Sequence, residues 1–142
     1  MKITRYQKAI LVAVALVSLV AVFDFFEYPA SFWLYSFALG AVAATVYYIF
    51  VGDKSEAIAM FAGFYIMMMF GLEDFTFFLI RPIFQDYAFG IPPVIENLSG
   101  HAVIGRVAEF MGSATVTPKV LIVSVLIGGV ITYYVTKWLK QM

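Results

Sequence analysis

Two adjacent carboxyl groups interrupt one of the most apolar stretches of this sequence. The run MMMFGLEDFTFFLIRP extends from Met67 to Pro82 and places Glu73 beside Asp74, between methionines and aromatic residues. Desolvation favours the neutral form of a carboxyl group, so a carboxyl in apolar surroundings can stay protonated near neutral pH and act as a general acid. This pair is therefore the first candidate for chemistry.

A second acidic pair, Asp24 and Glu27, ends the first apolar stretch, and its i, i+3 spacing places both acids on one helix face. Asp24 is the sixteenth residue after Lys8, and Glu73 is the seventeenth after Glu56. At 1.5 Å per residue, both pairs lie roughly 24–26 Å from the inner boundary of a membrane core about 30 Å thick. We expect the four acids to line one outward-facing pocket.

The neighbours of the central pair suggest what such a pocket would bind. Arg81 follows Asp74 by seven residues, so it shares a helix face with that acid and can neutralise it. The aromatic residues near the acids could stabilise a carbocation through their ring faces; they are Phe25, Phe26, Phe75, Phe77 and Phe78. We assign catalysis to Glu73 and Asp74, and substrate binding to Asp24, Glu27, Phe77, Phe78 and Arg81.

One segment resembles a known family. Leu72-Glu73-Asp74, followed by Phe77-Phe78 and Pro82, is similar to the acidic-pair-then-Phe-Phe segment of the membrane lycopene cyclase domains of carotenoid synthesis. The resemblance covers the 11 residues from 72 to 82. It implies a membrane enzyme that protonates an isoprenoid or another lipid-soluble substrate, with the two acids as catalytic groups and no cofactor required.

An alternative hypothesis is a non-catalytic protein that binds a divalent cation, or a small subunit of a larger membrane complex. Oxygen ligands suit Mg²⁺, Ca²⁺ or Mn²⁺, and one imidazole would extend the choice to iron or zinc. No metal-binding spacing such as Glu-x-x-His is present. The candidate ligands are Asp24, Glu27, Glu73, Asp74, His101 and Glu109.

The composition indicates where these groups must function. Of the 142 residues, 63% are apolar and 13% are charged, whereas soluble domains average about a quarter charged. With a mean hydropathy of +0.95, the chain is expected to be an integral membrane protein. A net charge of zero suggests no nucleic-acid partner, and the absence of cysteine excludes disulfides, thiol redox chemistry and metal–sulfur sites.

The elements that position the acids are four apolar stretches within one transmembrane domain, 1–142. A span needs about 20 residues, but the uncharged parts of the first and third stretches have only 15 and 16, so each must continue through its acids. Backbone in lipid must be hydrogen-bonded internally, which predicts an all-α, four-helix bundle. The first stretch is expected to be a retained span because no small-x-small cleavage site follows it. The predicted spans are about 9–28, 31–51, 57–80 and 120–136.

Basic residues predict the orientation, because cytoplasmic loops are enriched in lysine and arginine. With both termini in the cytoplasm, six basic residues lie on the inner side and three on the outer side, which suits a multi-pass protein of the plasma membrane. The inner residues are Lys2, Arg5, Lys8, Lys54, Lys137 and Lys140, and the outer ones are Arg81, Arg106 and Lys119.

The outer loop, 85–118, connects the third and fourth spans. Pro92-Pro93 would break a helix there. After it, Val103, Ile104, Val107 and Phe110 recur at helical spacing, with Arg106 and Glu109 off that face. We expect a short amphipathic helix that lies on the outer surface or folds over the helix ends. The loop, which carries His101 and Glu109, is expected to roof part of the acidic pocket. The expected partners are the bilayer and a lipid-soluble ligand, with a homo-oligomer or a larger membrane complex also open.

Overall fold

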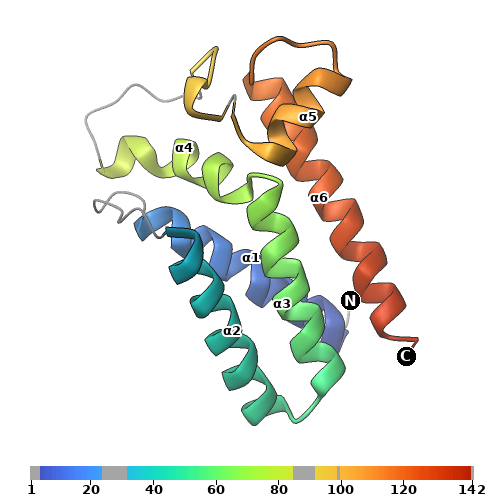
Figure 1. The fold of residues 1–142 in the computed structure, drawn as a ribbon. Coiled ribbons are helices and arrows are strands. Elements are labelled where there is room, and N and C mark those ends of the chain that lie inside the picture. Colours follow the sequence, from blue (N-terminus) through green and yellow to red (C-terminus); the bar gives the residue numbers. More distant parts are fainter. Residues whose placement is uncertain (1–3, 24–31, 85–91, 99, 142) are drawn as a thin grey trace.

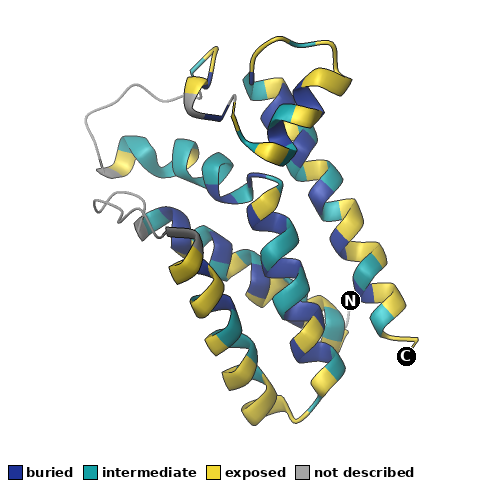
Figure 2. Ribbon diagram, viewed as in Figure 1, coloured by how far each residue is buried: buried dark blue, intermediate teal, exposed yellow. Residues whose placement is uncertain are grey.

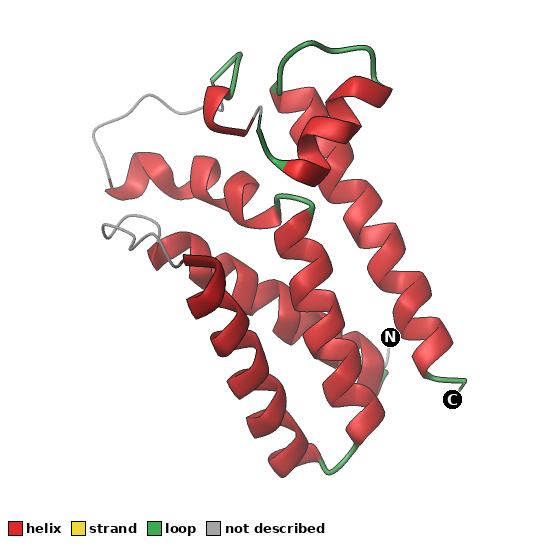
Figure 3. Cartoon of the chain, viewed as in Figure 1, coloured by secondary structure: helices red, strands yellow, loops and turns green. Residues whose placement is uncertain are grey.

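Helices make up all the regular structure in the part of the chain that the computed structural model describes, residues 4–23, 32–84, 92–98 and 100–141. The prediction of an all-helical chain is therefore confirmed for the described residues, where the regular elements are helices (Figure 3). The elements are α1 (Arg5–Phe23), α2 (Phe32–Val51), α3 (Lys54–Met69), α4 (Leu72–Phe84), a short 3₁₀ helix η1 (Glu96–Leu98), α5 (Ala102–Phe110) and α6 (Pro118–Leu139).

Three helices, α1, α2 and α6, are long and apolar enough to cross a membrane. The bent pair α3 and α4 would make a fourth span if the two helices are counted as one. The apolar helices are thus compatible with membrane insertion. The four-span bundle, its sidedness and the plasma-membrane location stay predictions.

The α3 helix occupies the centre of the molecule and packs against α1, α2 and α6 (Figure 1). The α4 helix packs against α1, and α5 packs against α6. The first residues of α1 and the last residues of α6 come together at one end of the bundle, as two termini on one side of a membrane would require. Most of α2 is exposed along its length, which suits a helix that faces lipid (Figure 2).

The third predicted span is not one continuous helix. We expected a helix to run through the acidic pair, but α3 ends at Met69 and α4 leaves it at an angle of 68°. The rise along α3 from Glu56 therefore stops at Phe70, after about 21 Å. The apolar residues 75–80 run across the end of the bundle instead of continuing outward. The depth in the membrane that was calculated from the rise per residue therefore applies only up to the bend.

Side chains from two other helices shape this bend. Gly71 has φ +83, a left-handed conformation that favours glycine, and a Cβ there would lie 2.7 Å from Ile104 Cδ1 and 2.8 Å from Leu121 Cδ1. Ser124 of α6 donates a hydrogen bond from its Oγ to the Phe70 carbonyl oxygen at 2.9 Å. Gly128 lets Phe70 approach α6, because a Cβ at Gly128 would lie 2.6 Å from Phe70 Cβ.

Local capping fixes where the other helices begin. Asp53 Oδ1 accepts hydrogen bonds from the Ser55 and Glu56 amides at 2.9 and 3.1 Å, which starts α3. Thr117 Oγ1 accepts from the Val120 amide at 3.4 Å, and Pro118 occupies the first turn of α6.

Two apolar clusters hold the helices together. The first joins α1 to α3 through small residues on α1 and larger ones on α3: Ala9, Ala13, Val17 and Val20 against Met60, Phe64, Met67 and Met68. The second lies beyond the bend and joins α5 to the start of α6, with Phe75 and Phe78 of α4 packed against it. The described residues between α4 and α6, 92–98 and 100–117, are thus anchored by a core of their own.

Substitution of Gly71 tests the bend. Gly71→Ala adds a Cβ to a left-handed residue and against two side chains, so we expect the free energy of unfolding in detergent to fall by about 2–5 kcal/mol. Gly112→Ala is the matched control, because Gly112 has φ +70 but nothing within 4 Å of its Cβ position. It should cost only about 1–2 kcal/mol. Equal losses for the two variants would show that Ile104 and Leu121 do not constrain the bend.

Removal of the Ser124 hydroxyl tests its hydrogen bond to the bend. Ser124→Ala deprives the Phe70 carbonyl of a donor in an apolar region, so it should lower the free energy of unfolding by about 1–3 kcal/mol. In Ser18→Ala, the lost bond is only a local one to the Val14 carbonyl within α1. That control should change stability by less than about 0.5 kcal/mol. A Ser124 variant as stable as the Ser18 variant would contradict this role.

Candidate functional site

The predicted catalytic acids lie in the first turn of α4, immediately after the bend. Glu73 is only 7% exposed, and Asp74 is half-buried. The helix dipole favours negative charge at this end of α4, whereas burial favours the neutral acid. A third span without the bend would have placed both carboxyl groups in the middle of a helix, away from the positive end of a helix dipole.

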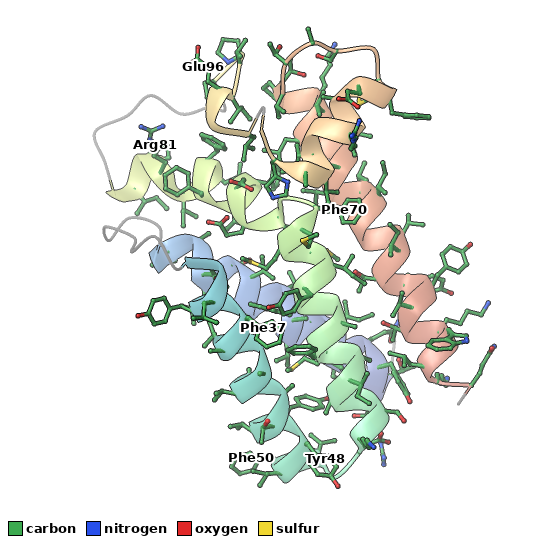
Figure 4. All side chains as sticks on the ribbon, in the orientation of Figure 1. Phe37, Tyr48, Phe50, Phe70, Arg81 and Glu96 are labelled. Atoms are coloured by element: carbon green, nitrogen blue, oxygen red, sulfur yellow. The ribbon has the colours of Figure 1, made fainter. Side chains whose placement is uncertain are left out.

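The aromatic residues predicted to contact substrate follow on the same helix. Phe77 and Phe78 are both partly buried and pack edge to face, with ring centroids 5.5 Å apart. Arg81, in the last turn of α4, lies with its guanidinium carbon 5.9 Å from the centroid of the Phe77 ring. Figure 4 shows Arg81 projecting from α4 on the side away from α1 and α2.

His101 begins α5. Its Nδ1 accepts a hydrogen bond from the Ile104 amide at 3.3 Å, which makes the imidazole the N-cap of this helix. An accepting Nδ1 must be unprotonated, so the proton of the neutral ring is on Nε2. Burial lowers the pKa of His101 below its ordinary value of 6.5. His101 thus has a structural part in the loop.

Glu109, the other loop residue named as a candidate metal ligand, lies on the exposed face of α5. Its carboxylate pairs with Arg106 at 2.7 Å, and both side chains are well exposed. Surface pairs of this kind contribute little to stability. The buried face of α5 consists of Ile104, Val107 and Ala108.

The convergence of all four predicted acids stays a prediction, because Asp24 and Glu27 lie outside the described residues. The helix that precedes them, α1, does pack against α4. Within the described part of the chain, no three His, Asp or Glu side chains lie close enough together to hold a metal ion.

A further buried acid, Glu56, was not singled out from the sequence. Its side chain is 1% exposed, and its Oε2 accepts a hydrogen bond from the Tyr47 hydroxyl at 3.3 Å. In the sequence analysis, Glu56 served only to mark the inner boundary of the third predicted span. The available signal was Asp53-x-x-Glu56, a capping residue with an acid three positions later, which indicates that Glu56 lies within the first helical turn.

The described structure defines an all-helical protein with several apolar helices and a bent central element. No family model, curated protein or solved structure matches the chain. Its function is therefore inferred from its own geometry.

The N-cap of α5 should make stability depend on pH. Because the folded-state pKa of His101 is below 6.5, the cap's contribution is fully present above about pH 6.5 and is lost as the pH falls through the lowered value. His101→Asn keeps a capping side chain that does not titrate, so its unfolding temperature should fall less below pH 6.5 than that of the wild type. His101→Ala should cost about 0.5–2 kcal/mol at pH 8. Identical pH profiles for the wild type and the Asn variant would contradict this role.

Proposed function

We propose that the chain is a multi-pass membrane protein that binds a lipid-soluble, isoprenoid-type substrate at the bend between α3 and α4 and protonates it through Glu73. The observation that carries the proposal is a buried carboxyl in the first turn of a helix that begins inside an apolar region. Ionisable residues at such positions are costly and are usually retained for function. Interrupted helices in membrane proteins often mark binding sites.

The surroundings of the acids favour an apolar substrate. Glu73 follows Leu72, which packs against the apolar cluster of α1 and α3, and Phe75 and Phe78 pack against the second cluster. The Phe77–Phe78 pair offers ring faces and edges close to Asp74 along the helix. Aromatic faces attract cations, which suits a carbocation formed when a double bond takes up a proton.

Each acid has a distinct part in this proposal. Glu73, the more buried acid, donates the proton to a substrate carbon. Asp74, which is half-buried, keeps a negative charge nearby and can return a proton to Glu73 from water. The dipole of α4 supports the charged form of either acid after transfer. The carbocation formed by protonation then loses a different proton to the Asp74 carboxylate, which passes it to Glu73 or to water. The substrate is thereby isomerised or cyclised with no net change in protons.

The test is deuterium transfer to carbon. The purified protein is reconstituted into lipid vesicles in D₂O buffer and incubated with geranylgeraniol. The recovered geranylgeraniol is returned to H₂O and analysed by mass spectrometry for deuterium that remains bound to carbon. Wild-type protein should incorporate deuterium at carbon, and Glu73→Gln should lower the rate about 10²–10⁴-fold, the usual contribution of a general acid. Thermal unfolding should show that the Gln variant is as stable as the wild type.

Glu109→Gln is the matched control, because it makes the same change at an exposed acid of the same chain. It should leave incorporation unchanged. Full incorporation by both Glu73→Gln and Asp74→Asn would refute the catalytic assignment. No incorporation by the wild type, combined with a stoichiometric metal in elemental analysis, would favour the cation-binding hypothesis instead.

A further inference from the structure

A pocket of about 260 Å³ lies at the end of the bundle opposite the bend, where the start of α1 meets the end of α6. Figure 1 shows the start of α1 and the end of α6 at the same end of the molecule. Among the residues that line it are Thr4, Tyr6 and Gln7 from the first segment and Tyr133, Lys137 and Lys140 from the second.

The charge of this pocket is of one sign. Lys137 and Lys140 are the charged residues in its lining, and neither forms an ion pair with a described carboxylate. Arg5 and Lys8 are exposed in the first turns of α1 at the same end. Lysines at the end of α6 also complement the negative end of its dipole. The pocket therefore has an excess of positive charge that an anion would neutralise.

The walls of the pocket are fixed by hydrogen bonds. The Thr4 amide donates to Gln7 Oε1 at 2.7 Å, and the Gln7 amide donates to Thr4 Oγ1 at 3.3 Å, a reciprocal capping box that holds the start of α1. Thr136 Oγ1 donates to the Thr132 carbonyl at 2.7 Å. Among the described residues, no hydrogen bond occupies the ammonium groups of Lys137 and Lys140 or the hydroxyls of Tyr6 and Tyr133, so these groups can donate to a ligand.

The length of α6 places the pocket at the level of lipid headgroups. Its 22 residues rise about 33 Å, close to the membrane core thickness of about 30 Å. Tyr134 and Trp138 are exposed near the same end, as aromatic residues at a membrane interface are. A cationic pocket between helices at this level is typical of sites for anionic headgroups.

An apolar crevice of about 600 Å³ adjoins the pocket at Tyr133, which lines both. It follows α6 from Tyr134 back to Val125, a rise of about 14 Å, and its other wall includes Val14 and Met67. One leaflet of hydrocarbon is about 15 Å deep. The crevice thus has the length of an acyl chain in one leaflet, next to a pocket for its headgroup.

We propose that the pocket and the crevice together form a binding site for one anionic phospholipid of the leaflet that faces the two termini. The phosphate group is held by Lys137 and Lys140, and an acyl chain lies in the crevice along α6. Neither Glu73 nor Asp74 lines the pocket or the crevice, and Leu72, the neighbour of Glu73, is the crevice residue nearest to the acids along the chain.

Native mass spectrometry of the full chain in detergent tests this proposal, with an equimolar mixture of dioleoyl-phosphatidylglycerol and dioleoyl-phosphatidylcholine as the probe. The wild type should prefer phosphatidylglycerol. Lys137→Gln combined with Lys140→Gln should weaken phosphatidylglycerol binding about tenfold to thirtyfold and leave phosphatidylcholine binding unchanged. Both lysines are exposed, so this variant should unfold at the wild-type temperature.

Lys119→Gln is the control, because Lys119 is exposed in the first turn of the same helix, at its other end. It should keep the wild-type preference. Gly129→Leu should weaken both lipids, because Gly129 lines the crevice and its Cβ position has only Met67 Cε nearby, at 3.9 Å. An equal loss in Lys119→Gln, or no preference in the wild type, would overturn the proposal. Displacement of phosphatidylglycerol by inorganic phosphate at similar concentration would also overturn it, because the ligand would then be a free anion.

Discussion

The termination of α3 at the bend imposes the constraint on which the rest of this structure depends. A helix that stops in an apolar region leaves backbone oxygens that water cannot reach, and each needs a donor from the protein. Ser124 of α6 supplies one to Phe70, and the two glycines, Gly71 and Gly128, allow the chain to turn and α6 to approach. The direction of α4, and with it the position of the acidic pair, follows from this contact.

The bend also explains how an apolar bundle accommodates buried acids. Glu56 and Glu73 are both buried, and both lie in the first turn of a helix, where backbone amides and the helix dipole favour a negative charge. Asp53 provides the start for the first of these helices. The second of these helices, α4, begins next to Glu73 only because α3 ends at the bend. A straight span would have placed Glu73 in the middle of a helix without this stabilisation.

The α6 helix connects the two proposed sites without mixing them. Ser124 and Gly128 hold the bend, residues between Val125 and Tyr134 border the apolar crevice, and the end of the helix carries Lys137 and Lys140. Small residues lie where another helix must approach, and cationic residues lie where the helix leaves the apolar region. The same helix can therefore support acid chemistry at one end and lipid binding at the other.

The sequence by itself determined that the chain is helical and apolar, and it identified Glu73 and Asp74 as unusual, because composition and run length depend only on neighbours along the chain. The prediction of one helix that continues through the acidic pair was wrong, although Gly71 lies only two residues before Glu73. A glycine permits a turn but does not require one. The turn depends on Ser124, which is 54 residues from Phe70, and on Ile104. Likewise, Lys137 lines a pocket because the start of α1 packs beside the end of α6. Contacts between segments so far apart in the chain arise from tertiary packing and leave no local periodicity in the sequence.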